Sequence, residues 1–95
     1  MININSDDYR RMAADLRDLI GDRDYFNGSV SIETEKWDGR LNSVLIVYRE
    51  RISYPEGDSN EIADIVPVWW EFHTIEENGE VLNDFQFSEL KKYIV

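Results

Sequence analysis

The sequence VPVWWEFHTIEENGEVLNDFQF, residues 66–87, is the stretch that decides the fold. It contains two runs in which apolar and polar residues alternate, as in β-strands with one buried face. Between the runs lies Asn78-Gly79, a dipeptide that favours the two-residue turn of a β-hairpin. The predicted pairs on the buried face are Phe72 with Phe85 and Trp70 with Phe87, and on the polar face His73 with Asp84 and Glu71 with Gln86.

The first strand of this hairpin is predicted to span residues 62–75, and Pro67 within it marks a sheet edge or a bulge. Another strand is predicted at residues 29–35, followed by the hairpin loop Trp37-Asp38-Gly39 with Gly39 in the left-handed conformation. This loop sets Val30 opposite Ile46 and Ile32 opposite Val44. It places one set of apolar residues on the buried face: Val44, Ile46, Tyr48, Ile52 and Tyr54. A two-residue Asp38-Gly39 turn would instead set Ile32 opposite Leu45 and turn the second strand over.

Residues 5–20 have the apolar spacing of an amphipathic helix. Asn5 is the predicted N-cap, Asp8 occupies the third helical position, and Gly21 is the predicted stop. Ile4 and Tyr9 are spaced to form a hydrophobic staple across the helix start. Ser88 is predicted to cap a short final helix whose packing residues are Leu90, Tyr93 and Ile94.

These elements predict a single α+β domain over residues 1–95. The expected order is an N-terminal helix, a four-stranded antiparallel meander and a short C-terminal helix. The helices would cover one face of the sheet in a two-layer sandwich. Residues 22–28 and 55–60 are predicted loops, because Gly, Pro, Asp, Asn and Ser are concentrated there.

The charge is distributed unevenly along the chain. The 95 residues carry a net charge of -10, and residues 52–90 contain ten acids but no Lys or Arg. Such a field repels nucleic-acid phosphates and steers basic partners, or it serves solubility alone. With no cysteine, signal peptide or long apolar run, we expect a cytoplasmic protein that binds neither membranes nor nucleic acid directly.

Catalytic chemistry finds little support in the sequence. His73 is the one histidine, and Asp84 could orient it, but no nucleophile accompanies the pair. Residues 22–28 resemble a calcium-binding loop only in their acids, since Phe26 stands at a ligand position and Gly28 comes one residue late. We therefore expect no catalytic residues, metal ligands or cofactors, with weak cation binding by an acidic surface as an alternative.

The predicted registers leave one sheet face without helices. That face would display Leu45, Val47, Ile65, Pro67, Trp69, Ile75 and Leu82, rimmed by Glu33, Arg49, Arg51, Glu71, His73 and Asp84. Monomers seldom expose so large an apolar patch, although a loop or a curled sheet could cover part of it. The candidate partner-binding residues are Trp69, Leu45, Val47, Arg49, Arg51, Ile65, Glu71 and His73.

The sequence thus favours a non-enzymatic protein-binding module that docks through the open sheet face, with its acidic half steering a basic protein. Small acidic inhibitors, toxin immunity proteins and phage anti-defence proteins share this physical profile. The first alternative is a homodimer or small assembly built on the same face. An enzyme or cation-binding domain based on His73 and its neighbouring carboxylates is the second.

Overall fold

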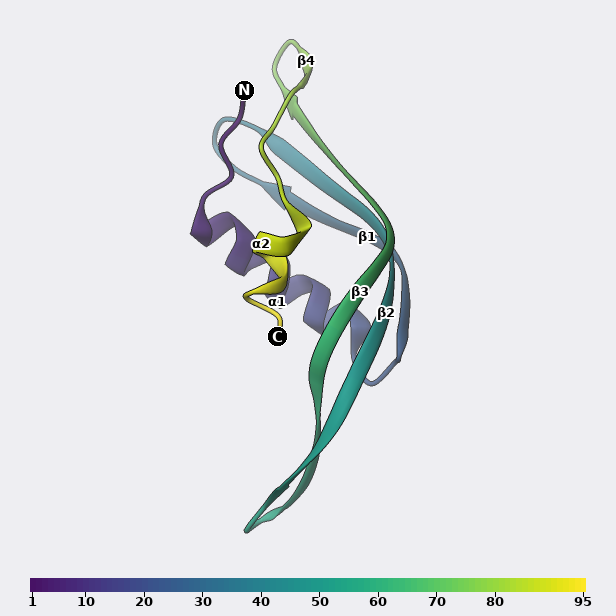
Figure 1. Cartoon of the computed structure of the whole chain (residues 1–95). Coiled ribbons are helices and arrows are strands. Elements are labelled where there is room, and N and C mark those ends of the chain that lie inside the picture. The colour runs from purple at the N-terminus through teal and green to yellow at the C-terminus, as the bar shows by residue number, and fades with distance from the viewer.

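A computed structural model describes residues 1–95. Its elements are α1 (Ser6–Ile20), β1 (Tyr25–Glu33), β2 (Asp38–Tyr54), β3 (Gly57–Glu76), β4 (Gly79–Val81) and α2 (Phe87–Lys91). The four strands form one antiparallel sheet in the order β1-β2-β3-β4, and both helices lie on the same side of it (Figure 1). The predicted α+β fold class is confirmed.

The start and end of α1 are fixed by local chemistry. The Asn5 side chain accepts a hydrogen bond from the Asp8 backbone N–H, and the Asp8 carboxylate accepts one from the Asn5 N–H. This reciprocal capping box satisfies two backbone donors that the helix cannot pair internally. Gly21 ends the helix at a positive φ of 54°, which non-glycine residues rarely adopt. The predicted helix and both of its caps are confirmed.

The core lies between the helices and one face of the sheet, here called the inner face. Its fully buried side chains come from α1 (Met12, Leu16, Ile20), from β2 and β3 (Leu41, Leu45, Ile65) and from α2 (Leu90). Aromatic rings extend this core toward the C-terminus, with Phe72 stacked on Phe85 at a centroid distance of 4.4 Å. Burial of these apolar groups is the main favourable term in folding.

The hairpin of β1 and β2 differs from the prediction in its turn. Residues 34–37 form the connection, Glu33 pairs with Asp38, and Val30 lies opposite Leu41 rather than Ile46. The Thr34 hydroxyl donates to the Trp37 carbonyl at 2.7 Å and accepts from the Trp37 N–H at 3.0 Å, which closes the turn. The shift is an odd number of residues, so it turns β2 over and buries Leu45 instead of Ile46.

Gly39 has a packing role in place of the predicted turn role. It belongs to β2, lies opposite Ile32 and does not have a positive φ. A Cβ at this position would lie 2.7 Å from the Phe72 ring and 2.8 Å from the Trp37 ring. Glycine is needed here because these two aromatic side chains pass directly over the backbone.

Two bulges change which residues of β3 face inward. Val44 pairs with Trp69 but Leu45 pairs with Pro67, so Val68 is an extra residue; a second register shift leaves Ala63 extra. Trp70 and Ile65 therefore both face the core, although simple alternation puts them on opposite faces. Pro67, predicted to mark a sheet edge or a bulge, lies directly beside the bulge at Val68. The predicted placement of Ile65 on the open face is wrong.

The hairpin of β3 and β4 is shorter than predicted. Glu76 pairs with Gly79 and Thr74 with Val81, a shift of two residues that keeps the predicted faces, and β4 ends at Val81. The chain then leaves the sheet because the backbone of Ile2 bonds to Leu82 and Asp84. Phe85 and Phe87 still pack on the predicted rings, Phe72 and Trp70, as side-chain neighbours rather than as strand partners.

The middle hairpin extends beyond the helices as a two-stranded arm (Figure 1). Tyr54 pairs with Gly57, so the predicted loop at residues 55–60 is reduced to Pro55 and Glu56. The arm makes the molecule long and narrow, at 53 × 24 × 18 Å. At the C-terminus, α2 is capped by the backbone of Gln86 and has no side-chain cap, so the predicted capping role of Ser88 is wrong.

The observed register predicts unequal effects for two neighbouring substitutions. Leu45→Ala should lower the free energy of unfolding by about 2–5 kcal/mol, because it leaves a cavity at a fully buried site. Ile46→Ala, on the opposite face, should cost about 1 kcal/mol or less. Urea unfolding followed by circular dichroism measures both. A larger loss for Ile46→Ala would contradict this register.

Candidate functional site on the outer face of the sheet

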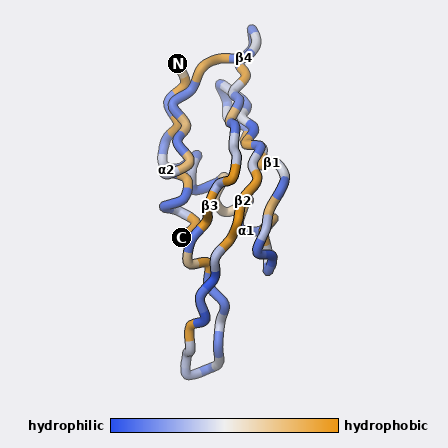
Figure 2. The backbone as a smooth tube through the Cα atoms, turned by 45° about the vertical axis from the view of Figure 1, so that its right-hand side comes forward, coloured by the Kyte–Doolittle hydropathy of each residue, from blue (hydrophilic) through white to orange (hydrophobic).

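The face of the sheet opposite the helices, here called the outer face, carries a continuous apolar area. Its centre consists of residues that pair across β1, β2 and β3, and we call it the outer patch: Tyr25, Val44, Ile46, Tyr48, Val66 and Trp69. About half of the surface of Tyr25, Tyr48 and Trp69 is open to solvent. Figure 2 shows the hydrophobic stretches of β2 and β3 running side by side at this level.

Opposed carboxylates lie at both ends of the outer face, and one of these pairs adjoins the outer patch. On the arm side, Glu50 and Glu61 lie directly opposite each other on β2 and β3, with no cation between them. Like charges in directly opposed positions destabilise a strand pair. At the far end of the outer face, beyond Arg40 and His73, Glu33 pairs with Asp38 in the same way. Arg40 is the one Lys or Arg among the strand residues that share this face.

A chain of polar side chains crosses the sheet beside Trp69. The Ser29 hydroxyl donates to the Asn42 Oδ1 at 2.6 Å, and the Asn42 amide donates to Glu71 at 3.0 Å. Glu71 in turn lies 3.0 Å from Nε2 of His73, whose Nδ1 is 3.2 Å from Glu80. Each of the four strands contributes to this chain, so it fixes the side chains on one border of the outer patch.

Both ring nitrogens of His73 face carboxylates, which favours the charged imidazolium. The hydrogen bond to Glu71 raises the pKa of His73 above its ordinary value of 6.5, with Glu80 adding a further charge effect. Hydrogen bonds from Asn42 and His73 lower the pKa of Glu71 below its ordinary 4.5. When protonated, the His73 ring therefore lies between two carboxylates at this border of the patch.

The structure divides the predicted partner-binding residues into two groups. Trp69, Glu71 and His73 lie together on the outer face, as does the predicted patch residue Ile75. Leu45, Val47 and Ile65 are buried in the core, so their predicted exposure is wrong. The cause is the turned-over β2 and the bulge at Val68, which move odd-numbered residues inward.

The predicted arginines also lie elsewhere. Arg49 projects on the inner side, where it donates to the carbonyls of Gly21 and Arg23 at 2.6 and 2.9 Å and so anchors the chain after α1. Arg51 forms an ion pair with Asp58 across the arm. Asp84, predicted as a partner of His73, instead accepts a hydrogen bond from the Ile4 N–H at 2.7 Å.

The sequence does not predict most of the outer patch. Tyr25 falls in a predicted loop, and the predicted register puts Val44, Ile46 and Tyr48 on the buried face. The ambiguity is real because β2 is apolar on both faces at this level, so alternation alone does not select its orientation. The one local signal is Thr34, whose hydroxyl closes the turn three residues later.

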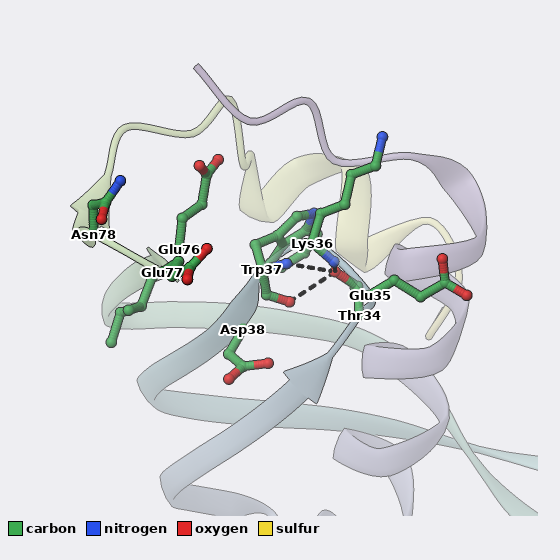
Figure 3. Close-up of a pocket in the computed structure, with 9 residues that line it drawn as sticks. Thr34, Glu35, Lys36, Trp37, Asp38, Glu76, Glu77 and Asn78 are labelled. Atoms are coloured by element: carbon green, nitrogen blue, oxygen red, sulfur yellow. Dashed lines mark hydrogen bonds between the residues drawn. The ribbon is translucent and has the colours of Figure 1, made fainter.

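The largest hollow of the surface lies between the β1–β2 turn and the β3–β4 turn (Figure 3). It is an open groove of about 710 Å³, lined by Thr34, Glu35, Lys36, Trp37, Asp38, Ile75, Glu76, Glu77 and Asn78. Its carboxylates point in different directions rather than toward one point, as Figure 3 shows. No group of three or more His, Asp or Glu side chains anywhere in the protein is arranged to hold a metal ion.

No protein-family model, curated protein or solved structure matches this chain. No helix is both long and apolar enough to cross a membrane.

The His73 site predicts a specific pH dependence. Its raised pKa stabilises the fold fully below about pH 6.5, and this contribution is lost as the pH rises through the folded-state pKa. The lowered pKa of Glu71 gives stability above about pH 4.5 that is lost as the pH falls through its folded-state pKa. NMR titration of the His73 ring should thus give a midpoint above 6.5, and Glu71→Gln should lower it.

Glu76→Gln is a suitable control because Glu76 does not contact the imidazole, and it should leave the midpoint where it is in the wild type. An unchanged midpoint in Glu71→Gln would show that the pair does not form in solution.

Proposed function

We propose that this protein is a non-enzymatic binding module that docks a basic protein through its outer patch. The proposal rests mainly on one observation: an apolar area that is open to solvent, spans three strands and has opposed carboxylates at its arm end. Trp and Tyr are favoured anchors of protein interfaces, and exposed apolar patches of this kind mark interaction surfaces. Inhibitors, immunity proteins and anti-defence proteins are functional classes with this profile.

Charge argues for a partner of opposite sign. Every residue of β3 with a formal charge is acidic apart from His73, and the chain as a whole carries -10. A cationic partner would relieve the repulsion between Glu50 and Glu61, and long-range attraction would speed its association. Face-to-face docking of a second copy would instead bring two strongly negative molecules together.

The rigid setting of the patch supports the same proposal. Its residues lie on strands that are packed against the core from the other side, rather than on loops. Val44 and Ile46 alternate with the fully buried Leu45, and the polar chain from Ser29 to Glu80 fixes the adjoining side chains. A surface that is already ordered loses little conformational entropy on binding.

Trp69→Asp tests the proposal. A photoreactive amino acid at Val66 would first crosslink the partner in an extract of the native cells, and the purified partner would then be titrated by calorimetry. Trp69→Asp should weaken its binding by about 30-fold or more, because the change removes an aromatic anchor and adds a negative charge to a desolvated area. Leu82→Asp is the control, since Leu82 is exposed but lies outside the patch.

Association kinetics with the same purified partner test the contribution of charge. The double variant Glu50→Gln, Glu61→Gln should slow association and flatten its dependence on salt, with the dissociation rate changing less. Equal affinity of wild type and Trp69→Asp would contradict docking through the patch. Sedimentation is also needed, because a wild-type dimer that Trp69→Asp dissociates would assign the patch to self-association.

A further inference from the structure

The two edges of the sheet differ in whether their backbone groups have partners. In an antiparallel pair, alternate residues direct their N–H and C=O toward the neighbouring strand. The Val47 N–H donates to the Asp24 carbonyl, and the Thr34 N–H donates to the Trp37 carbonyl. Even-numbered residues of β1 therefore face β2, and the odd-numbered residues direct their backbone groups outward.

These outward groups of β1 are free along most of the strand. The Glu33 carbonyl accepts a hydrogen bond from Arg11 at 3.0 Å, and no other element of the protein bonds to the outward N–H and C=O groups of Tyr25, Asn27, Ser29 and Ser31. The strand contains no Lys, Arg or Pro and no bulge. It therefore lacks the features that usually protect a sheet edge from pairing with another chain.

The opposite edge, along β3, is interrupted at several points. The outward N–H of Ile65 is bonded to the side chain of Asp64 at 2.8 Å, and Pro67 has no N–H. Further along, the outward carbonyl of Phe72 accepts from the Asn83 side chain at 3.2 Å, and Thr74 pairs with β4. Two bulges add to this protection. The open edge of β1 is thus a specific feature of one side of the molecule.

A groove runs along the open edge, between β1 and α1. It has a volume of about 290 Å³ and is lined by Asp15, Asp18, Leu19, Ser29, Val30 and Ser31. Neither Asp15 nor Asp18 takes part in an ion pair. The groove thus combines free backbone groups on one wall with unpaired carboxylates on the other.

We propose that this edge binds an extended, lysine- or arginine-rich segment of another polypeptide, which adds to the sheet as a fifth strand beside β1. Its backbone would bond to the outward groups of Asn27, Ser29 and Ser31, and its cationic side chains would meet Asp15 and Asp18. Main-chain pairing supplies affinity in this mode of recognition, and the side-chain positions supply specificity. The proposal goes beyond docking on the outer patch, and neither depends on the other.

A second copy of the chain fits this edge poorly. If all nine residues of β1 paired with β1 of a second copy, the twofold axis relating the two copies would have to pass near the central residue Ser29. Asp15 and Asp18 line the groove beside Ser29, so the axis would bring two such pairs of carboxylates together without a cation. A basic segment replaces this repulsion with attraction.

The geometry also specifies a probe peptide. Side chains of paired residues lie on the same face of a sheet, and the outward-bonding residues of β1 have their side chains on the outer face. Residues of an added strand that bond to β1 therefore point to the outer face, and the intervening ones point toward α1. A nine-residue peptide with lysine and threonine alternating, acetylated and amidated, can place lysines over Asp15 and Asp18 while its threonines pair with β1.

Amide hydrogen exchange measured by NMR tests the proposal with this peptide. At saturation, exchange at Asn27, Ser29 and Ser31 should slow by at least about tenfold, whereas Gly28 and Val30, already bonded to β2, should change little. The same peptide N-methylated on its threonines should bind at least about tenfold more weakly, because it keeps its charge but loses the backbone bonds. Asp15→Asn combined with Asp18→Asn should weaken the unmodified peptide by about tenfold.

Variants of the protein complete the test. Ser31→Pro removes an outward N–H that has no partner in the fold and should abolish the added protection, while Ser31→Ala should retain it. Trp69→Asp should leave peptide binding unchanged, which separates this edge from the outer patch. Equal binding of the N-methylated peptide, or no binding of either, would overturn the proposal. Concentration-dependent protection of these amides without peptide would overturn the choice of partner.

Discussion

The four-residue turn at residues 34–37 is the constraint on which the rest of the structure depends. The Thr34 hydroxyl closes it with two hydrogen bonds to the Trp37 backbone, and this fixes which residues of β1 and β2 pair with each other. Gly39 enforces the same register, because the rings of Trp37 and Phe72 occupy the space that a Cβ would need. Since side chains alternate along a strand, the turn also decides that Leu45 is buried and Ile46 is exposed.

Local signals in the sequence predicted the elements well, and long-range packing decided what they missed. The helix at residues 6–20 carries its own capping box and apolar spacing, so its prediction needed no tertiary information. The orientation of β2 was harder to predict, because Leu45 and Ile46 are equally apolar. The choice between them depends on the turn that Thr34 closes and on the space above Gly39. Trp69 was placed correctly because no bulge separates it from the turn at Asn78, whereas Ile65 lies beyond the bulge at Val68.

The bulges and the acids of β3 act together on the edge of the sheet. The bulge at Val68 places Pro67 at a position where the backbone groups point outward, away from β2. Because Pro67 has no N–H, it offers no donor there. Asp64 uses its carboxylate to bond the next outward N–H, and Lys91 of α2 holds that carboxylate at 2.5 Å. The hydrogen bond to Lys91 also lowers the pKa of Asp64. The carboxylate that bonds the Ile65 N–H therefore stays ionised to a lower pH than an ordinary carboxyl group would. No comparable device acts on β1.

This asymmetry bears on how the exposed surfaces of a thin sheet with one covered face would respond to a second copy of the chain or to a basic partner. Each exposed feature is unfavourable toward a second copy: the outer patch adjoins a pair of opposed carboxylates, and the β1 edge lies beside Asp15 and Asp18. The same groups attract a cationic chain. Under the two proposals, negative charge would have two effects: it would oppose self-association where apolar or backbone groups are left open, and it would select a partner of positive charge.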